Sequence, residues 1–114
     1  MQKLPTPTTN PQLQEITAQT RQGLEKIYGE QLEKLVLFGS QARGDARLDS
    51  DIDILIILKN SFDYSQESDR ISFLIADICL EYNVLISCAF ATSEQFQHHN
   101  SRFFRNVRAE GITL

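Results

Sequence analysis

Two periods of apolar residues run along this chain, and each predicts a different kind of element. A first set of positions recurs at helical spacing: Leu13, Ile16, Thr20, Leu24 and Ile27. This spacing predicts an amphipathic helix of about four turns. We expect Asn10 to cap this helix with Pro11 at its first position, and Gly29 to end it.

A second helix is expected in the middle of the chain, after a polar loop over 61–68. Helical spacing returns there at another set of positions: Ile71, Leu74, Ile75, Ile78 and Tyr82. Asp77 and Glu81 then fall on the solvent side of the helix.

The end of the chain predicts a third helix. Ser101 is a suitable N-cap and Gly111 a suitable terminator. Phe103, Phe104 and Val107 lie between them, and such aromatic residues belong more often to a core than to a binding face. An aromatic ring exposed here would instead indicate a surface for a partner.

Three apolar runs predict strands: Leu32–Phe38, Ile54–Leu58 and Val84–Phe90. The twelve residues between the first two strands favour an antiparallel pair. The helix-containing connection to the third strand permits a parallel, right-handed crossover. The sequence therefore predicts an α/β (α+β) fold with a small mixed sheet of three or four strands, flanked by helices.

Length and composition fit one compact domain. The chain has 114 residues, of which 41% are hydrophobic, and this suffices for a single core. The composition of residues 1–10 predicts a flexible lead-in, and residues 11–114 are expected to form a single domain. The net charge of −4 argues against a general nucleic-acid-binding protein, which would carry a basic face.

Cysteine and histidine residues indicate no metal site of their own. Cys79 and Cys88 stand in apolar surroundings, which favours buried free thiols over a disulfide. His98 and His99 are adjacent in a loop pattern and are expected on the surface. Neither a signal-peptide pattern nor a long apolar run is found, so a cytoplasmic protein is the default expectation.

The candidate chemistry lies between the first two strands. Asp51 and Asp53 precede an apolar run, although aspartate is depleted in strands. Side chains alternate along a strand, so the two carboxylates share one side, with Cα atoms about 6.5 Å apart. Such a pair suits Mg²⁺, which is held by carboxylates and substrate phosphates. Gly39 and Ser40 add a turn that lets an anion approach the backbone, and antiparallel strands would bring it to the same edge.

The spacing of these residues resembles a known family. Gly39-Ser40, ten residues and Asp51-x-Asp53 match the GS-x10-DxD signature of the polymerase-β-like nucleotidyltransferases. The longer string GSQARGDARLDSDID is similar to that of the minimal nucleotidyltransferases (MNT), which include the antitoxins of HEPN/MNT toxin–antitoxin pairs. The resemblance implies the polymerase-β-like fold. It also implies that the protein transfers AMP from ATP to a hydroxyl group of a partner HEPN toxin, namely that of a tyrosine.

The resemblance also implies roles for individual residues. Asp51 and Asp53 would be catalytic and would hold two Mg²⁺ ions. The residues implied in nucleotide binding are Gly39, Ser40, Arg43 and Ser50. Many family members carry a third carboxylate, whose position here falls near Leu85 or Ser87. This departure puts the general base in doubt.

Ordinary explanations stay open for several of these residues. Asp49, Ser50 and Asp51 are also typical turn residues, which hydrogen-bond to their own backbone. Arg43 either contacts the triphosphate, as the resemblance suggests, or pairs with an aspartate such as Asp45 or Asp49.

Two other functions stay open beside the AMP-transferring antitoxin. One is an antitoxin with a vestigial site that neutralises its toxin by binding alone. The other is a small-molecule nucleotidyltransferase that holds its acceptor between subunits of a homo-oligomer.

Overall fold

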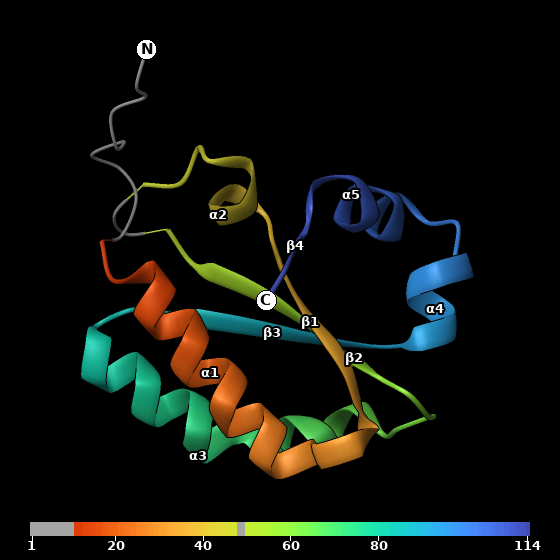
Figure 1. Ribbon diagram of the computed structural model, residues 1–114, viewed down its shortest axis with the longest axis horizontal. Helices are drawn as coiled ribbons and strands as arrows, with labels where there is room; N and C mark the ends of the chain where they lie inside the picture. The colour runs from red at the N-terminus through yellow and green to blue at the C-terminus, as the bar shows by residue number, and fades with distance from the viewer. Residues whose placement is uncertain (1–10, 48–49) are drawn as a thin grey trace.

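The computed structural model describes residues 11–47 and 50–114, and these form a four-stranded sheet with helices on both faces (Figure 1). The elements, in chain order, are α1 (Leu13–Tyr28), the 3-10 helix η1 (Gly29–Gln31), β1 (Leu32–Phe38), α2 (Ser40–Arg43), β2 (Ile52–Leu58), α3 (Tyr64–Tyr82), β3 (Ile86–Thr92), α4 (Ser93–His98), α5 (Arg102–Glu110) and β4 (Ile112–Thr113). The predicted lead-in, residues 1–10, lies outside the described residues. No helix in the described ranges is long and apolar enough to cross a membrane.

The sheet is mixed, as predicted, and its strand order is β3-β2-β1-β4. β1 and β2 are antiparallel, with Phe38 opposite Asp53, and β2 and β3 are parallel, with Asp53 opposite Ser87. β4 adds a short antiparallel partner to β1. β2 is therefore a central strand, which explains why it reads as an unbroken apolar run.

The alternation of β2 residues divides the core into two layers. Ile52, Ile54 and Ile56 are fully buried on the side that α1 and α3 cover. Leu55 and Ile57 are fully buried on the opposite side, in the core cluster that includes Val107 of α5. Figure 1 shows α1 and α3 on one face of the sheet and α2 and α5 on the other.

Three predicted boundaries were wrong by a few residues. α1 begins at Leu13 after the N-cap residue Gln12, so Pro11 is not its first helical residue, and Asn10 lies outside the described residues. α3 begins at Tyr64, so the predicted polar loop 61–68 is too long. The Asp63 side chain accepts a hydrogen bond from the Gln66 amide and starts the helix early.

The third strand begins at Ile86, two residues later than predicted. Asn83 ends α3 in the left-handed conformation, with φ 53°, and the Val84 amide donates to the carbonyl of Cys79. The chain needs this turn to leave the helix, so strand pairing starts only after it.

The two cysteines are half-buried free thiols, one on α3 and one on β3. Burial, together with the nearby Cys79, raises the pKa of Cys88 to about 12. The Cys79 sulfur accepts a hydrogen bond from the Ile86 amide. The prediction of free thiols is therefore confirmed, and Cys88 stays a protonated packing residue at neutral pH.

A buried polar contact ties α1 to the start of α3. The Tyr28 hydroxyl donates to the Glu67 carboxylate at 2.8 Å, and Glu67 is only 7% exposed. Arg70 lies 3.6 Å from the same carboxylate. Burial, and then the bond to Glu67, raises the pKa of Tyr28, so the hydroxyl stays protonated and keeps donating.

We expect Tyr28→Phe to cost about 1–3 kcal/mol of unfolding free energy, because it removes a hydrogen bond from a buried carboxylate. Tyr82→Phe is the matched control, since the Tyr82 hydroxyl bonds Glu15 and Gln19 nearer the surface. Its loss should cost about 1 kcal/mol or less. Urea denaturation of both variants measures the difference, and equal costs would contradict the structural role given to Glu67.

Candidate functional site

The two aspartates lie at the start of β2, on the face opposite α1 and α3. Asp53 is half-buried between Phe38 of β1 and Ser87 of β3, and Asp51 is exposed just before the strand. Ile52, between them, is fully buried in the other layer. The two carboxylates therefore share one side of the sheet, as the alternation of side chains predicts.

These carboxylates are short of compensating charge. Neither has an ion pair or hydrogen bond to another residue in the described part of the chain. Burial raises the pKa of Asp53, the charge of Asp51 raises it further, and only Arg43 lowers it. A divalent cation would relieve both causes, because it keeps carboxylates ionised beside it.

The donor set fits a cation that also takes oxygen ligands from a substrate. The described residues contain no group of three or more histidine, cysteine or acidic side chains that could hold a metal. Two carboxylates alone suit Mg²⁺, which usually keeps waters and shares phosphates with the protein. Asp51 and Asp53 are thus the residues that would hold it.

The turn after β1 lies directly against Asp53. Gly39 has φ +73°, and a Cβ atom at this position would overlap the Asp53 carboxylate. Both the backbone conformation and the close approach require glycine here. The Gly39 carbonyl accepts the Ala42 and Arg43 amides at 3.1 Å, which closes the single turn of α2.

Ser40 is the first residue of α2 and is half-buried beside this turn. Its hydroxyl has no hydrogen bond to another described residue. The first amides of a helical turn also lack intrahelical acceptors. The structure thus brings Gly39, Ser40, Asp51 and Asp53 to one edge of the sheet, as expected for antiparallel strands.

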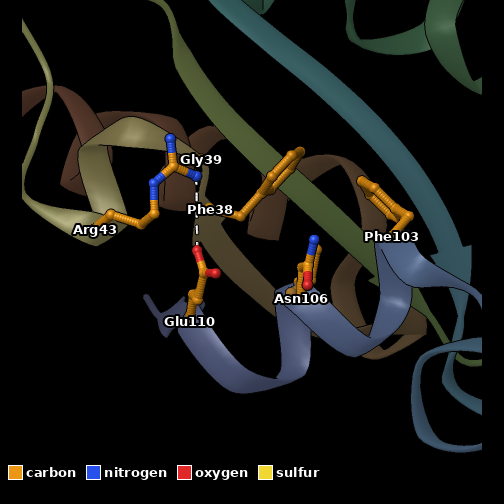
Figure 2. Close-up of a pocket in the computed structure, with 7 residues that line it drawn as sticks. Phe38, Gly39, Arg43, Phe103, Asn106 and Glu110 are labelled. Atoms are coloured by element: carbon orange, nitrogen blue, oxygen red, sulfur yellow. Dashed lines mark ion pairs between the residues drawn. The ribbon is translucent and has the colours of Figure 1, made fainter.

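Arg43 pairs with carboxylates. Its guanidinium lies 3.4 Å from Asp45 and 3.6 Å from Glu110 of α5. Asp45 was one of the partners predicted from the sequence, whereas Asp49 lies outside the described residues. The ion pair between Arg43 and Glu110 was not predicted from the sequence. It joins α2 to α5 (Figure 2).

Ser50 occupies a turn. Its hydroxyl accepts the Arg47 amide at 2.7 Å, and its own amide donates to the Arg47 carbonyl at 3.0 Å. The side-chain amide nitrogen of Gln41 donates to the backbone carbonyl of Ser50 at 3.4 Å. Ser50 thus makes the local backbone contacts of a turn residue, and its role in nucleotide binding stays a prediction.

A pocket of about 240 Å³ opens beside this edge, between the β1–α2 turn and α5 (Figure 2). The turn contributes Phe38, Gly39 and Arg43. The residues from α5 share one helix face: Phe103, Asn106, Val107 and Glu110. Sequence reasoning found this helix but missed its place in the site. The i, i+3, i+4, i+7 spacing defines the face but does not say what the face meets.

Neither of the two positions predicted for the third acid carries a carboxylate. The register places Ser87 directly opposite Asp53, and Leu85, the other predicted position, is 60% exposed just before β3. The Ile52 amide donates to the Leu85 carbonyl, which fixes this part of the chain next to Asp51. Both predicted positions are thus beside the aspartates, and neither carries a charge.

Residues 18–106 match the family model described as the nucleotidyltransferase domain. This chain belongs to the nucleotidyltransferase family. A similar protein of Methanocaldococcus jannaschii is 39% identical over 96 residues, which is 80% of this chain and 86% of the relative, and is called "Putative protein adenylyltransferase MJ0604". A second protein of the same organism, "Putative protein adenylyltransferase MJ0141", is 34% identical over 64% of this chain and 73% of its own length.

The fold of this nucleotidyltransferase is also found in solved toxin–antitoxin structures. One, described as a toxin-antitoxin with AMP-PNP, has a TM-score of 0.57 and 17% identity over 82% of this chain and 68% of that one. Another, a mutant of the toxin-antitoxin MntA-HpeT, has a TM-score of 0.56 and 17% identity over 83% and 68% of the two chains. At this identity the likeness concerns the fold, and it confirms the predicted mixed sheet with flanking helices.

We expect Gly39→Ala to abolish binding of Mg²⁺ and nucleotide by this nucleotidyltransferase, because the new methyl group displaces the Asp53 carboxylate. Gly44→Ala is the matched control: it has φ +84°, but its Cβ would meet open space. Both variants should lose stability through the positive φ, by roughly 1–2 kcal/mol for Gly44→Ala in the left-handed helical region and by more for Gly39→Ala, whose ψ of −153° is tolerated essentially by glycine alone. Calorimetric titration with Mg²⁺-ATP should then show loss of binding in Gly39→Ala alone. Equal binding by the two variants would contradict the role of the Asp53 contact.

The raised pKa of Asp53 has a stability consequence. The folded protein holds the Asp53 proton more tightly than the unfolded chain does, so ionisation of Asp53 destabilises the fold as pH rises through its titration. We expect Asp53→Asn to raise the Tm of the metal-free protein at pH 7 and to leave it unchanged below pH ~3, where the carboxyl is neutral in both states. Thermal unfolding at both pH values, with Asp77→Asn on the exposed side of α3 as control, measures the effect. A lower Tm for Asp53→Asn at pH 7 would contradict it.

Proposed function

We propose that this nucleotidyltransferase moves AMP from ATP to a hydroxyl group of a partner protein and uses Mg²⁺ to do so. The single observation that carries the proposal is the contact of the Gly39 turn with Asp53, beside Asp51. This contact brings together, at the end of β1 and the start of β2, a backbone turn that suits phosphates and a pair of carboxylates that suits cations. A nucleoside triphosphate with its bound cations is the ligand that uses both.

The reaction is a substitution at the α-phosphate. The acceptor oxygen forms a bond to the α-phosphorus, the bond from that phosphorus to the bridging oxygen breaks, and pyrophosphate leaves with the electron pair. The hydroxyl proton passes to solvent. Two Mg²⁺ ions, when bound, neutralise the phosphate charge and orient the attacking and leaving oxygens. Asp51 and Asp53 hold them, and the Gly39–Ser40 backbone and the Ser40 hydroxyl grip the outer phosphates.

Arg43 exchanges partners when the nucleotide binds. Its pairs with Asp45 and Glu110 are half-exposed, so solvent and salt screen them and they stabilise the fold little. A triphosphate offers several anionic oxygens and charge-assisted hydrogen bonds. The guanidinium therefore gains by turning from Glu110 toward the phosphates that lie at Gly39 and Ser40. Ser50 would support nucleotide binding indirectly, because its hydrogen bonds with Arg47 hold the turn that precedes Asp51.

The acceptor in this proposal is a toxin. The similar archaeal proteins are named as adenylyltransferases of proteins, and the solved structures of the same fold are toxin–antitoxin complexes. Together with the resemblance to HEPN/MNT antitoxins, this supports a HEPN toxin that is modified on a tyrosine hydroxyl in the cytoplasm. The protein would act as the antitoxin.

The uncharged positions beside Asp53 favour a second candidate. With serine opposite Asp53 and an exposed leucine next to Asp51, neither of these two positions supplies a third carboxylate to activate the acceptor. An antitoxin that neutralises its toxin by binding alone would need none. Exposed Leu85, at the rim of the site, would then be part of the contact with the toxin.

The test is transfer of α-³²P-labelled ATP to a co-expressed HEPN toxin, with Mg²⁺ or with EDTA. We expect label on the toxin with the wild type, none with Asp51→Asn/Asp53→Asn, and none after the acceptor tyrosine of the toxin is changed to phenylalanine. Asp69→Asn/Asp77→Asn is the matched control, because it removes two exposed carboxylates from α3 on the other face.

The proposal is supported if the toxin carries label with Asp69→Asn/Asp77→Asn but not with Asp51→Asn/Asp53→Asn. We expect the second variant to transfer AMP at least about 100-fold more slowly than the wild type. A tight complex that never carries label would overturn it in favour of the binding antitoxin. In that case Asp51→Asn/Asp53→Asn should still protect cells from the toxin, whereas protection lost with binding intact would exclude simple occlusion.

A further inference from the structure

The pocket between the β1–α2 turn and α5 has two chemically different ends (Figure 2). Arg43 and Glu110 form the charged end, next to Gly39. Phe103 and Asn106 lie toward the other end, on the same helix face. Phe103 and Glu110 are seven residues apart, which is about 10 Å along a helix axis. This span suits a nucleoside that extends from phosphates at the charged end.

The size of the pocket suits a single ring system. Its volume of about 240 Å³ is below the ~300–1,000 Å³ of pockets that enclose a whole drug-sized ligand. The remainder of a larger ligand would therefore lie outside it. A base attached to a sugar and a triphosphate has this form.

The aromatic end presents an exposed ring in a fixed position. Phe103 is 41% exposed, and its ring packs edge-to-face with Phe38 at 5.5 Å and with Phe104 at 5.2 Å between centroids. Two perpendicular neighbours hold the ring while one side stays open to the pocket. Bases stack on such rings whatever their sequence, so Phe103 supplies affinity for a base but little selectivity.

Asn106 supplies the selectivity. Its side chain is exposed at the pocket, and its amide has no hydrogen bond to another residue in the described ranges. An asparagine amide both donates and accepts, which matches adenine, whose N6 amino group donates beside an accepting ring nitrogen. The corresponding N7 and O6 edge of guanine only accepts. A free amide one turn from an exposed ring therefore favours adenine for a base that turns its N7 edge to α5, since guanine matches such an amide only through its O6 and N1 edge.

We propose that this pocket takes the adenine ring of the nucleoside triphosphate, with Phe103 as its stacking surface and Asn106 as the residue that reads its amino edge. The assignment rests on the proposed function for the presence of a nucleotide. It adds that the final helix selects ATP, although the signature between the first two strands binds only phosphates and cations. Phe103 and Asn106 are then specificity-determining residues, and Arg43 marks the boundary between the base and phosphate ends.

The experiment measures binding of three probes by calorimetry in Mg²⁺, without any acceptor: ATP, GTP and inorganic tripolyphosphate. We expect the wild type to prefer ATP over GTP by roughly 10-fold, as one good bidentate contact provides. Asn106→Ala and Phe103→Ala should each weaken ATP by roughly 10-fold and leave tripolyphosphate unchanged. Unchanged tripolyphosphate binding also shows that the variants are folded. Phe73→Ala, which truncates an 84% exposed ring on α3, is the matched control and should change nothing.

A change of preference is a stronger test than a loss. Asn106→Asp replaces the amide by a group that only accepts, so it should disfavour adenine and pair with the N1 and N2 donors of guanine. The added charge weakens both nucleotides alike, so the ratio of ATP to GTP affinity is the readout. We expect this ratio to fall from roughly 10 to below 1.

Each contrary result has a separate meaning. If both truncations weaken tripolyphosphate as much as ATP, the pocket acts on phosphates and the assignment is wrong. If they leave ATP binding intact but slow transfer to the toxin, the pocket receives the acceptor instead, and the assignment is wrong while the proposed function stands. If the wild type binds neither ATP nor tripolyphosphate, the proposed function itself fails.

Discussion

The close approach of Gly39 to Asp53 is the constraint on which the rest of the site depends. It requires three things at once: an antiparallel β1–β2 pair in which Phe38 lies opposite Asp53, a left-handed backbone at Gly39, and the absence of a side chain there. A slip of one residue in this register would turn Asp53 into the layer under α1 and α3. Such a slip would bury the Asp53 carboxylate in that apolar layer and would force the side chains on both faces of β2 to repack. The core thus fixes the register, and the register positions the carboxylate.

The same arrangement carries an electrostatic cost in the absence of a cation. Asp53 is half-buried beside a second carboxylate, and Arg43, the described residue whose positive charge lowers the pKa of Asp53, is shared with Asp45 and Glu110. A site tuned only for stability would have paired these charges or replaced them. Unrelieved charge of this kind is typical of functional sites, where a ligand supplies what the fold leaves out. In the proposed function that ligand is a cation with its phosphates, which would balance the acidic pair and occupy the turn beside it.

Two parts of the chain, far apart in sequence, build the site. The first is continuous, from the end of β1 through α2 to the start of β2, and it carries the cation and phosphate chemistry. The second is α5, which lies over the same face because Val107 packs in the core cluster of Val36, Leu55 and Ile57. β4, directly after α5, pairs with β1 and returns the chain to the sheet. Chemistry therefore comes from the middle of the chain, and the pocket wall from its end.

The sequence by itself determined the parts that depend on local order. Helical spacing, strand alternation and a twelve-residue connection gave the order of elements, the mixed sheet and the shared side of Asp51 and Asp53, because these follow from backbone geometry over a few residues. Two of the boundaries that failed depend on local caps. Asp63 starts α3 inside the polar segment, and the left-handed turn at Asn83 delays strand pairing to Ile86. Only the tertiary structure decided that Glu110 meets Arg43, that Ser87 stands opposite Asp53, and that Phe103 and Asn106 face the Gly39 turn. Each is a contact between distant elements, and its position depends on how the layers pack, which no local pattern records.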